Sequence, residues 1–222
     1  TQYGPQLDIK KIREVGESDK KEGFDEEKLR PAARRDSAAQ FAALVELVQK
    51  EIADVELRQL LVDMLETNRA AIVVFPAATR MHHAFVGGFI DHILSVTKNC
   101  LFLADKYTTQ YPQLAATLSR DLVIAGGVLH DIGKLRELEP RPEGAAYTAA
   151  GELIGHVLQG RDMLREAALG RKLDPELLLR LEHIIVAHQR LPEWGAPKPP
   201  MTAEALLVHF ADDIDAKMEM FD

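Results

Sequence analysis

The dipeptide His130–Asp131 directly follows the apolar stretch Leu122–Leu129, and this limits the folds that the chain can adopt. A helix this apolar is buried, so the imidazole and the carboxylate at its end are buried with it. Burying both groups is unfavourable unless each finds a polar or charged partner. One divalent cation would serve both, because imidazole and carboxylate are metal ligands. The fold must therefore bring a cation or further polar groups to the end of this helix.

All eight histidines lie between residues 82 and 209, and none lies earlier in the chain. Most of them are within or beside apolar helical sequence, where a neutral ring needs a partner. Histidine clustered with aspartate indicates a metal or catalytic site. His209 is the exception, because its position predicts the surface of a helix.

Apolar residues recur at helical spacing from residue 37 onward, which predicts an all-α domain. Ser37 is expected to cap the first helix, whose apolar face includes Phe41 and Val48. Further helices are predicted over residues 54–67, 84–107, 115–130, 149–168, 174–189 and 202–220, with Thr148, Asp174 and Thr202 as caps. Residues 137–147 and 191–200 contain several prolines and are predicted to be loops.

The first 35 residues follow a different pattern. Leu7 and Ile9 alternate with charged residues, which predicts a short strand, and a charged linker follows. The chain is therefore divided into residues 1–35 and a helical domain over residues 36–222. It begins with Thr1 rather than Met, so a fragment of a longer protein is expected.

The overall charge and composition narrow the choice of partners. A net charge of −8 gives no global attraction for nucleic acid, so any such contact must be local. Cys100 is the single cysteine, which predicts a reducing, cytoplasmic location without an internal disulfide. No apolar run approaches the roughly 20 residues of a membrane span, so no membrane partner is expected.

The order of several motifs carries a family resemblance. His92, then His130–Asp131, then Asp212 after Ala211 resemble the HD superfamily of metal-dependent phosphohydrolases. A second, longer set of motifs consists of Pro76-Ala77-Ala78, His82-His83-Ala84-Phe85, Gly87-Gly88, Asp91-His92, His130-Asp131-Ile132-Gly133-Lys134, Tyr147-Thr148, Gly155-His156, Glu182-His183, Ala187-His188 and Asp212-Asp213-Ile214-Asp215-Ala216-Lys217. These motifs resemble more closely the bacterial 3′–5′ exoribonucleases that join an OB-fold to an HD domain.

The resemblance covers nearly the whole chain and implies its organisation. Residues 36–222 would form an HD-domain helical bundle. Residues 3–15 look like the last strand of an N-terminal OB-fold, a nucleic-acid-binding β-domain, most of which would lie outside this chain. A homo-oligomer is left open.

The resemblance also implies a set of site residues. His92, His130, Asp131 and Asp212 would bind the metal, and Asp131 and Lys134 would be catalytic, with Lys134 neutralising phosphate charge. Candidates for a second metal or for contact with the scissile phosphate are His156, His183 and His188. Candidates for substrate contact are His83 and Trp194, whose indole is suited to stacking on a base.

The ligand types favour Mn²⁺ as the cofactor, with Fe²⁺, Ni²⁺, Co²⁺ or Mg²⁺ as alternatives, because the set has imidazole and carboxylate but no thiolate. One departure from the family bears on the number of ions. The family usually has two adjacent histidines where this chain has His188–Gln189, which weakens the case for a second ion. The sequence does not decide between one ion and two.

Three functions are compatible with these observations. The first is a 3′–5′ exoribonuclease that hydrolyses single-stranded RNA and releases nucleoside 5′-monophosphates. The second is an HD-type phosphohydrolase acting on small nucleotides. The third is a nucleic-acid-binding protein with weak or no catalysis, an alternative that Gln189 keeps open. The sequence favours the first and does not distinguish RNA from DNA.

Overall fold

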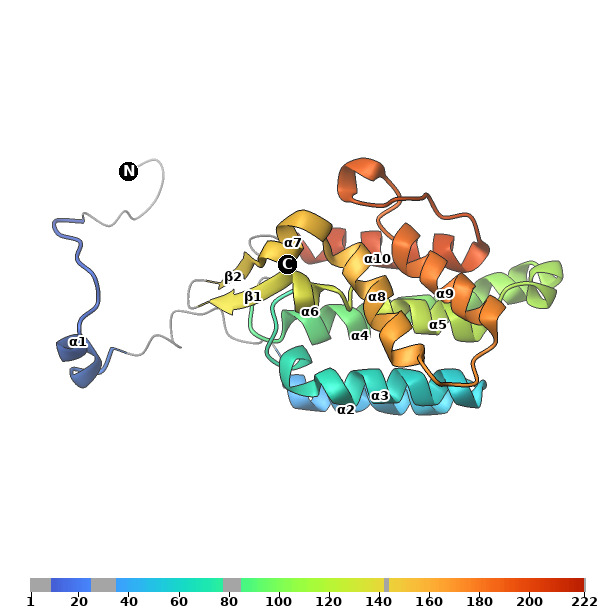
Figure 1. Cartoon of the computed structure of the whole chain (residues 1–222), viewed down its shortest axis with the longest axis horizontal. Helices are drawn as coiled ribbons and strands as arrows, with labels where there is room; N and C mark the ends of the chain where they lie inside the picture. The colour runs from blue at the N-terminus through green and yellow to red at the C-terminus, as the bar shows by residue number, and fades with distance from the viewer. Residues whose placement is uncertain (1–8, 25–34, 78–84, 142–143, 222) are drawn as a thin grey trace.

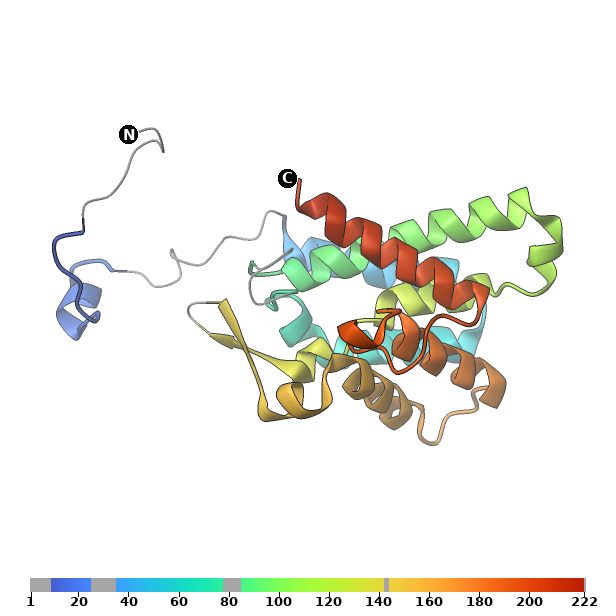
Figure 2. The ribbon, with the colours of Figure 1, turned by 90° about the horizontal axis from the view of Figure 1, so that it is seen from above.

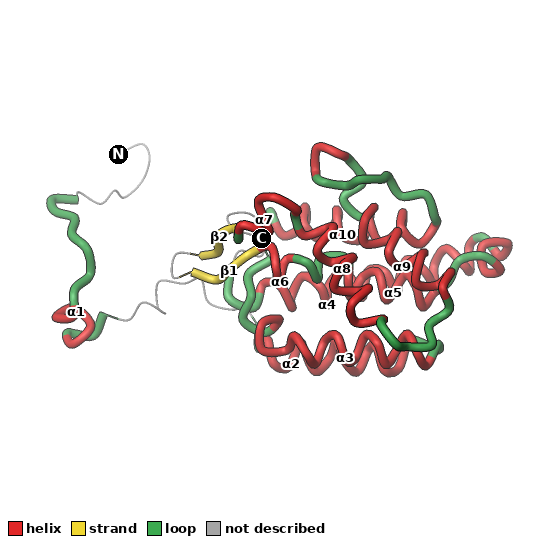
Figure 3. Tube along the Cα trace, in the orientation of Figure 1, coloured by secondary structure: helices red, strands yellow, loops and turns green. Residues whose placement is uncertain are grey.

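The fold is almost entirely helical (Figures 1 and 3). The computed structural model describes residues 9–24, 35–77, 85–141 and 144–221. Its α-helices are α1 (Glu17–Lys21), α2 (Ser37–Glu51), α3 (Val55–Ile72), α4 (Gly88–Gln110), α5 (Arg120–Leu129), α6 (Lys134–Glu137), α7 (Ala149–Ile154), α8 (His156–Ala168), α9 (Pro175–Ala187) and α10 (Ala203–Glu219). Two 3₁₀ helices, η2 (Pro112–Ala116) and η3 (Pro192–Trp194), and one antiparallel hairpin, β1 (Leu138–Arg141) with β2 (Gly144–Tyr147), complete the described elements. The predicted all-α class is confirmed for the described residues.

Helix α4 is central to the bundle. It packs against α5, α10 and α2, and Figure 2 shows α10 crossing it. Its residues Phe89, Ile93 and Val96 recur at helical spacing and are fully buried. Packing of this apolar face against the neighbouring helices stabilises α4. In the described residues, no helix is both long and apolar enough to cross a membrane.

Two glycines let α5 approach its neighbours closely. A Cβ on Gly127 would lie 3.0 Å from the backbone Cα of Thr97 in α4. A Cβ on Gly126 would lie 2.6 Å from Ile184 in α9 and 2.8 Å from Val208 in α10. The end of α5, which carries His130, is therefore held among α4, α9 and α10.

The predicted caps Thr148, Asp174 and Thr202 are confirmed, because each side chain accepts hydrogen bonds from backbone N–H groups in the first turn of its helix. The prediction for Ser37 is wrong. Asp36 is the cap instead, and its carboxylate accepts from the N–H groups of Ala38 and Ala39.

Three element boundaries also differ from the prediction. The expected helix over residues 149–168 is divided into α7 and α8 at Gly155, whose φ of 78° interrupts a right-handed helix. Most of the expected loop over residues 137–147 is the β1–β2 hairpin. The helix expected from residue 115 begins at Arg120, because Ser119 caps it and η2 occupies the preceding residues.

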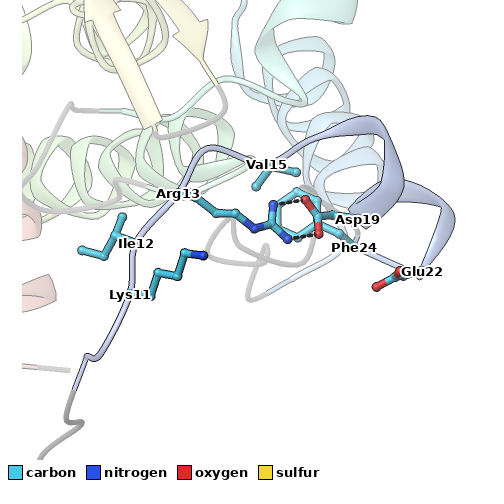
Figure 4. Close-up of a pocket in the computed structure, with 7 residues that line it drawn as sticks. All are labelled: Lys11, Ile12, Arg13, Val15, Asp19, Glu22 and Phe24. Carbon is cyan, nitrogen blue, oxygen red and sulfur yellow. Dashed lines mark hydrogen bonds and ion pairs between the residues drawn. The ribbon is translucent and has the colours of Figure 1, made fainter.

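The N-terminal segment has no strand within its described residues 9–24. It contains α1 and an ion pair of 2.5 Å between Arg13 and Asp19. A hollow in this segment is lined by Lys11, Ile12, Arg13, Val15, Asp19, Glu22 and Phe24 (Figure 4). All seven belong to residues 11–24, so this hollow is separate from the predicted metal ligands. Leu7 of the expected strand lies outside the described residues, as do residues 1–8 and 25–34 generally, so the predicted OB-fold remnant stays a prediction.

Candidate metal centre

Three predicted ligands from three helices form a first donor set, which consists of His92 of α4, His130 at the end of α5 and Asp212 of α10. Their nearest donor atoms lie within 4.8 Å of one another. His92 Nε2 is 3.2 Å from Asp212 Oδ1 and 3.3 Å from His130 Nε2. Both imidazoles are fully buried. The set can therefore surround an ion without any rearrangement of the helices.

Hydrogen bonds on the opposite ring nitrogens orient both histidines. His130 Nδ1 donates to the carbonyl oxygen of Gly127 at 2.9 Å. His92 Nδ1 donates to Asp215 Oδ2 at 2.8 Å, and the Ser95 hydroxyl donates to the other oxygen of Asp215. Each Nε2 is consequently directed into the donor set, as a metal ligand requires.

A second donor set consists of Asp131, His156 and His188. Asp131 Oδ1 lies 3.5 Å from Nε2 of each histidine. His156 Nδ1 is hydrogen-bonded to Glu137 at 3.0 Å, and His188 Nδ1 donates to the carbonyl oxygen of Ile185 at 2.7 Å. These bonds again direct Nε2 of each ring toward a common point.

Two buried atoms of the second set have no hydrogen-bond partner among the described residues: Asp131 Oδ1 and His156 Nε2. Buried polar atoms almost always have a hydrogen-bond or metal partner. An unpaired carboxylate oxygen that faces an unpaired ring nitrogen therefore indicates that a further group binds between the two atoms. A divalent cation supplies the missing interaction for both atoms. The donor sets thus fit a metal by their composition and by their unsatisfied atoms.

Asp131 belongs to the second set, but its carboxylate also contacts the histidines of the first set. Its Oδ2 atom is 3.5 Å from His92 Nε2 and 3.6 Å from His130 Nε2, while Oδ1 faces the second set. Lys134 Nζ also contacts Oδ2, at 2.6 Å. Because one carboxylate faces both sets and a lysine, its charge affects every candidate ligand in the centre.

The charge balance of the centre also favours a cation. Burial by itself would raise the pKa of Asp131, but the positive charge of Lys134 and contacts with the histidines hold it well below its usual range. Burial would likewise lower the pKa of His92, but its contacts with Asp131, Asp212 and Asp215 raise it well above the usual value. His92 therefore attracts a proton in the metal-free protein, and a metal ion would take the place of that proton.

His130 differs from His92. Burial lowers its pKa to about 4, despite partial compensation by Asp131 and Asp212. The ring is therefore neutral at physiological pH, which is the form that binds metals.

Two of the other candidates lie elsewhere in the described structure. His183 Nε2 accepts a hydrogen bond of 2.9 Å from the backbone N–H of Met201, and it belongs to neither donor set. Trp194 is 52% exposed in η3. His83 lies outside the described residues.

The two adjacent aspartates on α10 differ in their contacts. Asp212 belongs to the first set, whereas Asp213 forms an ion pair of 2.7 Å with Lys217. The prediction that His209 is a surface residue is wrong. Only 4% of it is exposed, and its Nδ1 donates to the carbonyl oxygen of His188 at 2.7 Å, which joins α10 to the end of α9.

Sequence reasoning missed Asp215 and Glu137 as partners of His92 and His156. Asp215 follows Asp212 by three residues, so the two lie on the same face of α10. That spacing was a usable signal. Glu137 gave none, because its contact with His156 depends on how the β1–β2 hairpin and α7, which separate α6 from α8, fold back.

Replacing Asp215 with Asn is expected to lower the metal affinity of the first set about 10- to 100-fold, because the carboxylate fixes the tautomer and direction of His92. Isothermal titration with Mn²⁺ measures this effect. Glu219→Gln provides a control that removes one carboxylate farther along α10. Equal affinities for Asp215→Asn and the wild type would contradict an orienting role.

The comparisons with known proteins agree with this geometry. The HD domain family model matches residues 89–217, which include every member of both donor sets. A protein named 3′–5′ exoribonuclease YhaM from Bacillus subtilis is 40% identical over 159 residues, which are 72% of this chain and 48% of the relative. A protein of the same name from Bacillus licheniformis is 32% identical in an alignment of 234 positions, which covers 99% of this chain and 71% of the relative.

This chain thus spans about half of the length of the first relative. No solved structure matches it. The family match implies a divalent metal as cofactor, and the two donor sets supply residues that can bind it. The extent of the family match and the arrangement of His92, His130, Asp131 and Asp212 lead to one conclusion: the chain belongs to the HD domain family.

Proposed function

We propose that this chain is the catalytic part of a metal-dependent 3′–5′ exoribonuclease that removes nucleoside 5′-monophosphates from single-stranded RNA. The observation that carries the proposal is the buried carboxylate of Asp131 between two His/Asp donor sets. The identity to two relatives named as 3′–5′ exoribonucleases supports the choice of reaction and substrate.

The proposed roles follow from the contacts. His92, His130, Asp131 and Asp212 hold one ion, and Asp131, His156 and His188 hold a second. Mn²⁺ is the proposed ion, because imidazole and carboxylate ligands without thiolate suit it. A bound divalent ion supplies Lewis acidity and lowers the pKa of water toward about 7.

Lys134 is proposed to contact the substrate phosphate. Its side chain is 12% exposed, in contrast to 1% for Asp131. Part of the lysine side chain is therefore accessible next to the buried carboxylate, and we propose that a phosphate oxygen approaches the ammonium group from this side. Its pKa is raised, because the carboxylate of Asp131 outweighs the effect of burial, so the group is charged at neutral pH.

A degradation assay tests the proposal. The protein with Mn²⁺ is incubated with a 5′-labelled single-stranded oligoribonucleotide, and a ladder that shortens from the 3′ end is expected. Removing the metal with EDTA should abolish the ladder, and adding Mn²⁺ should restore it. An intact oligonucleotide, with bound metal confirmed by elemental analysis, would contradict the proposal. Phosphate release from free nucleotides in place of RNA shortening would favour a small-nucleotide phosphohydrolase.

We also propose that residues 1–35 are the end of an OB-like domain and its linker, and that residues 36–222 are the HD domain. The change from charged sequence to apolar helical sequence near residue 36 supports this boundary. The buried thiol of Cys100 suits a reducing compartment, so the cytoplasm is the proposed location.

A further inference from the structure

Gln189 directly contacts the second donor set. Its amide Nε2 lies 3.1 Å from His188 Nε2, and His188 Nδ1 already donates to Ile185. When the ring is neutral with its proton on Nδ1, Nε2 carries a lone pair, and the amide N–H of Gln189 donates to this atom, which a metal would bind. Within the described part of the chain, the Gln189 side chain makes no other hydrogen bond.

The backbone keeps Gln189 at this position. Helix α9 ends with Ala187, and Arg190 has a φ of 66°, which is left-handed and unusual for arginine. The N–H of Arg190 bonds to the carbonyl oxygen of Ala187 and closes the turn. The side chain of Gln189 is therefore held next to His188 by the way in which the helix terminates.

The three atoms of the second set thus differ in their state. Asp131 Oδ1 and His156 Nε2 have no hydrogen-bond partner among the residues described, whereas His188 Nε2 is occupied by the amide. An ion that enters must displace that amide N–H. Because a carboxamide has a carbonyl oxygen beside its nitrogen, a half-turn of the same group replaces a donor with a metal ligand.

We propose that Gln189 sets the ion preference of the second donor set. Its amide caps His188 when the ion is absent, and its carbonyl oxygen becomes a ligand when the ion is bound. An amide oxygen is a hard ligand that suits Mn²⁺ and Mg²⁺, whereas imidazole also suits Ni²⁺ and Cu²⁺. This inference depends on the proposed second ion at Asp131, His156 and His188.

The test compares the wild type with Gln189→His and Gln189→Leu. Mn²⁺ and Ni²⁺ are titrated separately into metal-free protein, and the affinity of each ion is measured by calorimetry. His156→Ala identifies the binding step that belongs to the second set, and circular dichroism confirms that each variant is folded. The readout is the ratio of Ni²⁺ to Mn²⁺ affinity at that step.

Gln189→His is expected to shift this ratio about tenfold or more toward Ni²⁺, and Gln189→Leu to lose about tenfold in Mn²⁺ affinity. If the affinity ratio is unchanged in Gln189→His, the inference about Gln189 is overturned, but the proposal of a second ion is unaffected. Tighter Mn²⁺ binding by Gln189→Leu would also overturn it, because the amide would then be only a competitor. If the wild type and His156→Ala bind the same number of ions, both the second ion and the role of Gln189 are refuted, but the first set is unaffected.

Discussion

Replacing Asp212 with Asn is expected to reduce the proposed RNA degradation by about 10³-fold, because a charged candidate ligand of the first set becomes a neutral amide. Asp212 Oδ1 lies 3.2 Å from His92 Nε2 and 3.7 Å from His130 Nε2, so no other α10 carboxylate occupies its place in that set. Its pKa is held below the usual value, since contacts with His92 and the neighbouring His130 outweigh the effect of burial. The carboxylate is therefore ionised and available to a metal at neutral pH.

Asp213→Asn is the matched control. It makes the same chemical change at the next residue, but Asp213 pairs with exposed Lys217 rather than with a candidate ligand. The rate of 3′-end shortening and the metal content are measured for both variants. Equal losses in the two variants would show that net charge on α10, rather than a ligand at Asp212, determines activity.

The sequence was sufficient to predict most of the helical fold. Apolar residues at helical spacing predicted the main helices, and local capping residues such as Thr148 and Asp174 predicted where they start. These features depend on neighbours within one turn of the chain. For that reason they can be read from the sequence without knowledge of the packing.

The errors have longer-range causes. The β1–β2 hairpin pairs Leu138 with Tyr147, although the prolines and the glycine between them are typical of a loop. The break at Gly155 places His156 at the start of a new helix, where its Nδ1 meets Glu137. His209 is buried because α10 packs against the end of α9. The hairpin, the His156–Glu137 contact and the burial of His209 all depend on contacts between segments that are distant in sequence.

The candidate ligands were predicted from their order and from the family resemblance, and the structure brings six of them together: His92, His130, Asp131, His156, His188 and Asp212. It separates His183 from them. Periodicity along α10 did not distinguish Asp212 from Asp213, because the two positions are about 100° apart and the apolar pattern did not fix the orientation of the helix well enough to choose between them. The surrounding hydrogen bonds, especially Asp215 to His92, depend on packing between helices and required the structure.

Replacing Gly133 with Ala is expected to destabilise the fold by about 3 kcal/mol, which corresponds to a fall in melting temperature of about 6–12 °C. The backbone of Gly133 has an ordinary φ of −66°, so the cause is space rather than conformation. A Cβ at this position would lie 2.5 Å from the backbone nitrogen of Gly160 and closer still to the carbonyl oxygen of His156. Backbone atoms cannot rotate away, so α8 must shift.

Gly160→Ala is the graded control, since its Cβ would lie 3.2 Å from the backbone nitrogen of Gly133 and 3.4 Å from a methyl group of Ile185. Thermal unfolding in EDTA measures both variants without a contribution from bound metal, and a smaller loss is expected for Gly160→Ala. Because Gly133 lies between Asp131 and Lys134 and touches the start of α8, its substitution should also move His156 away from Asp131. Mn²⁺ affinity at the second set should then fall more than affinity at the first. A Gly133→Ala variant with the wild-type melting temperature and unchanged binding at both sets would show that α6 and α8 are not packed this closely.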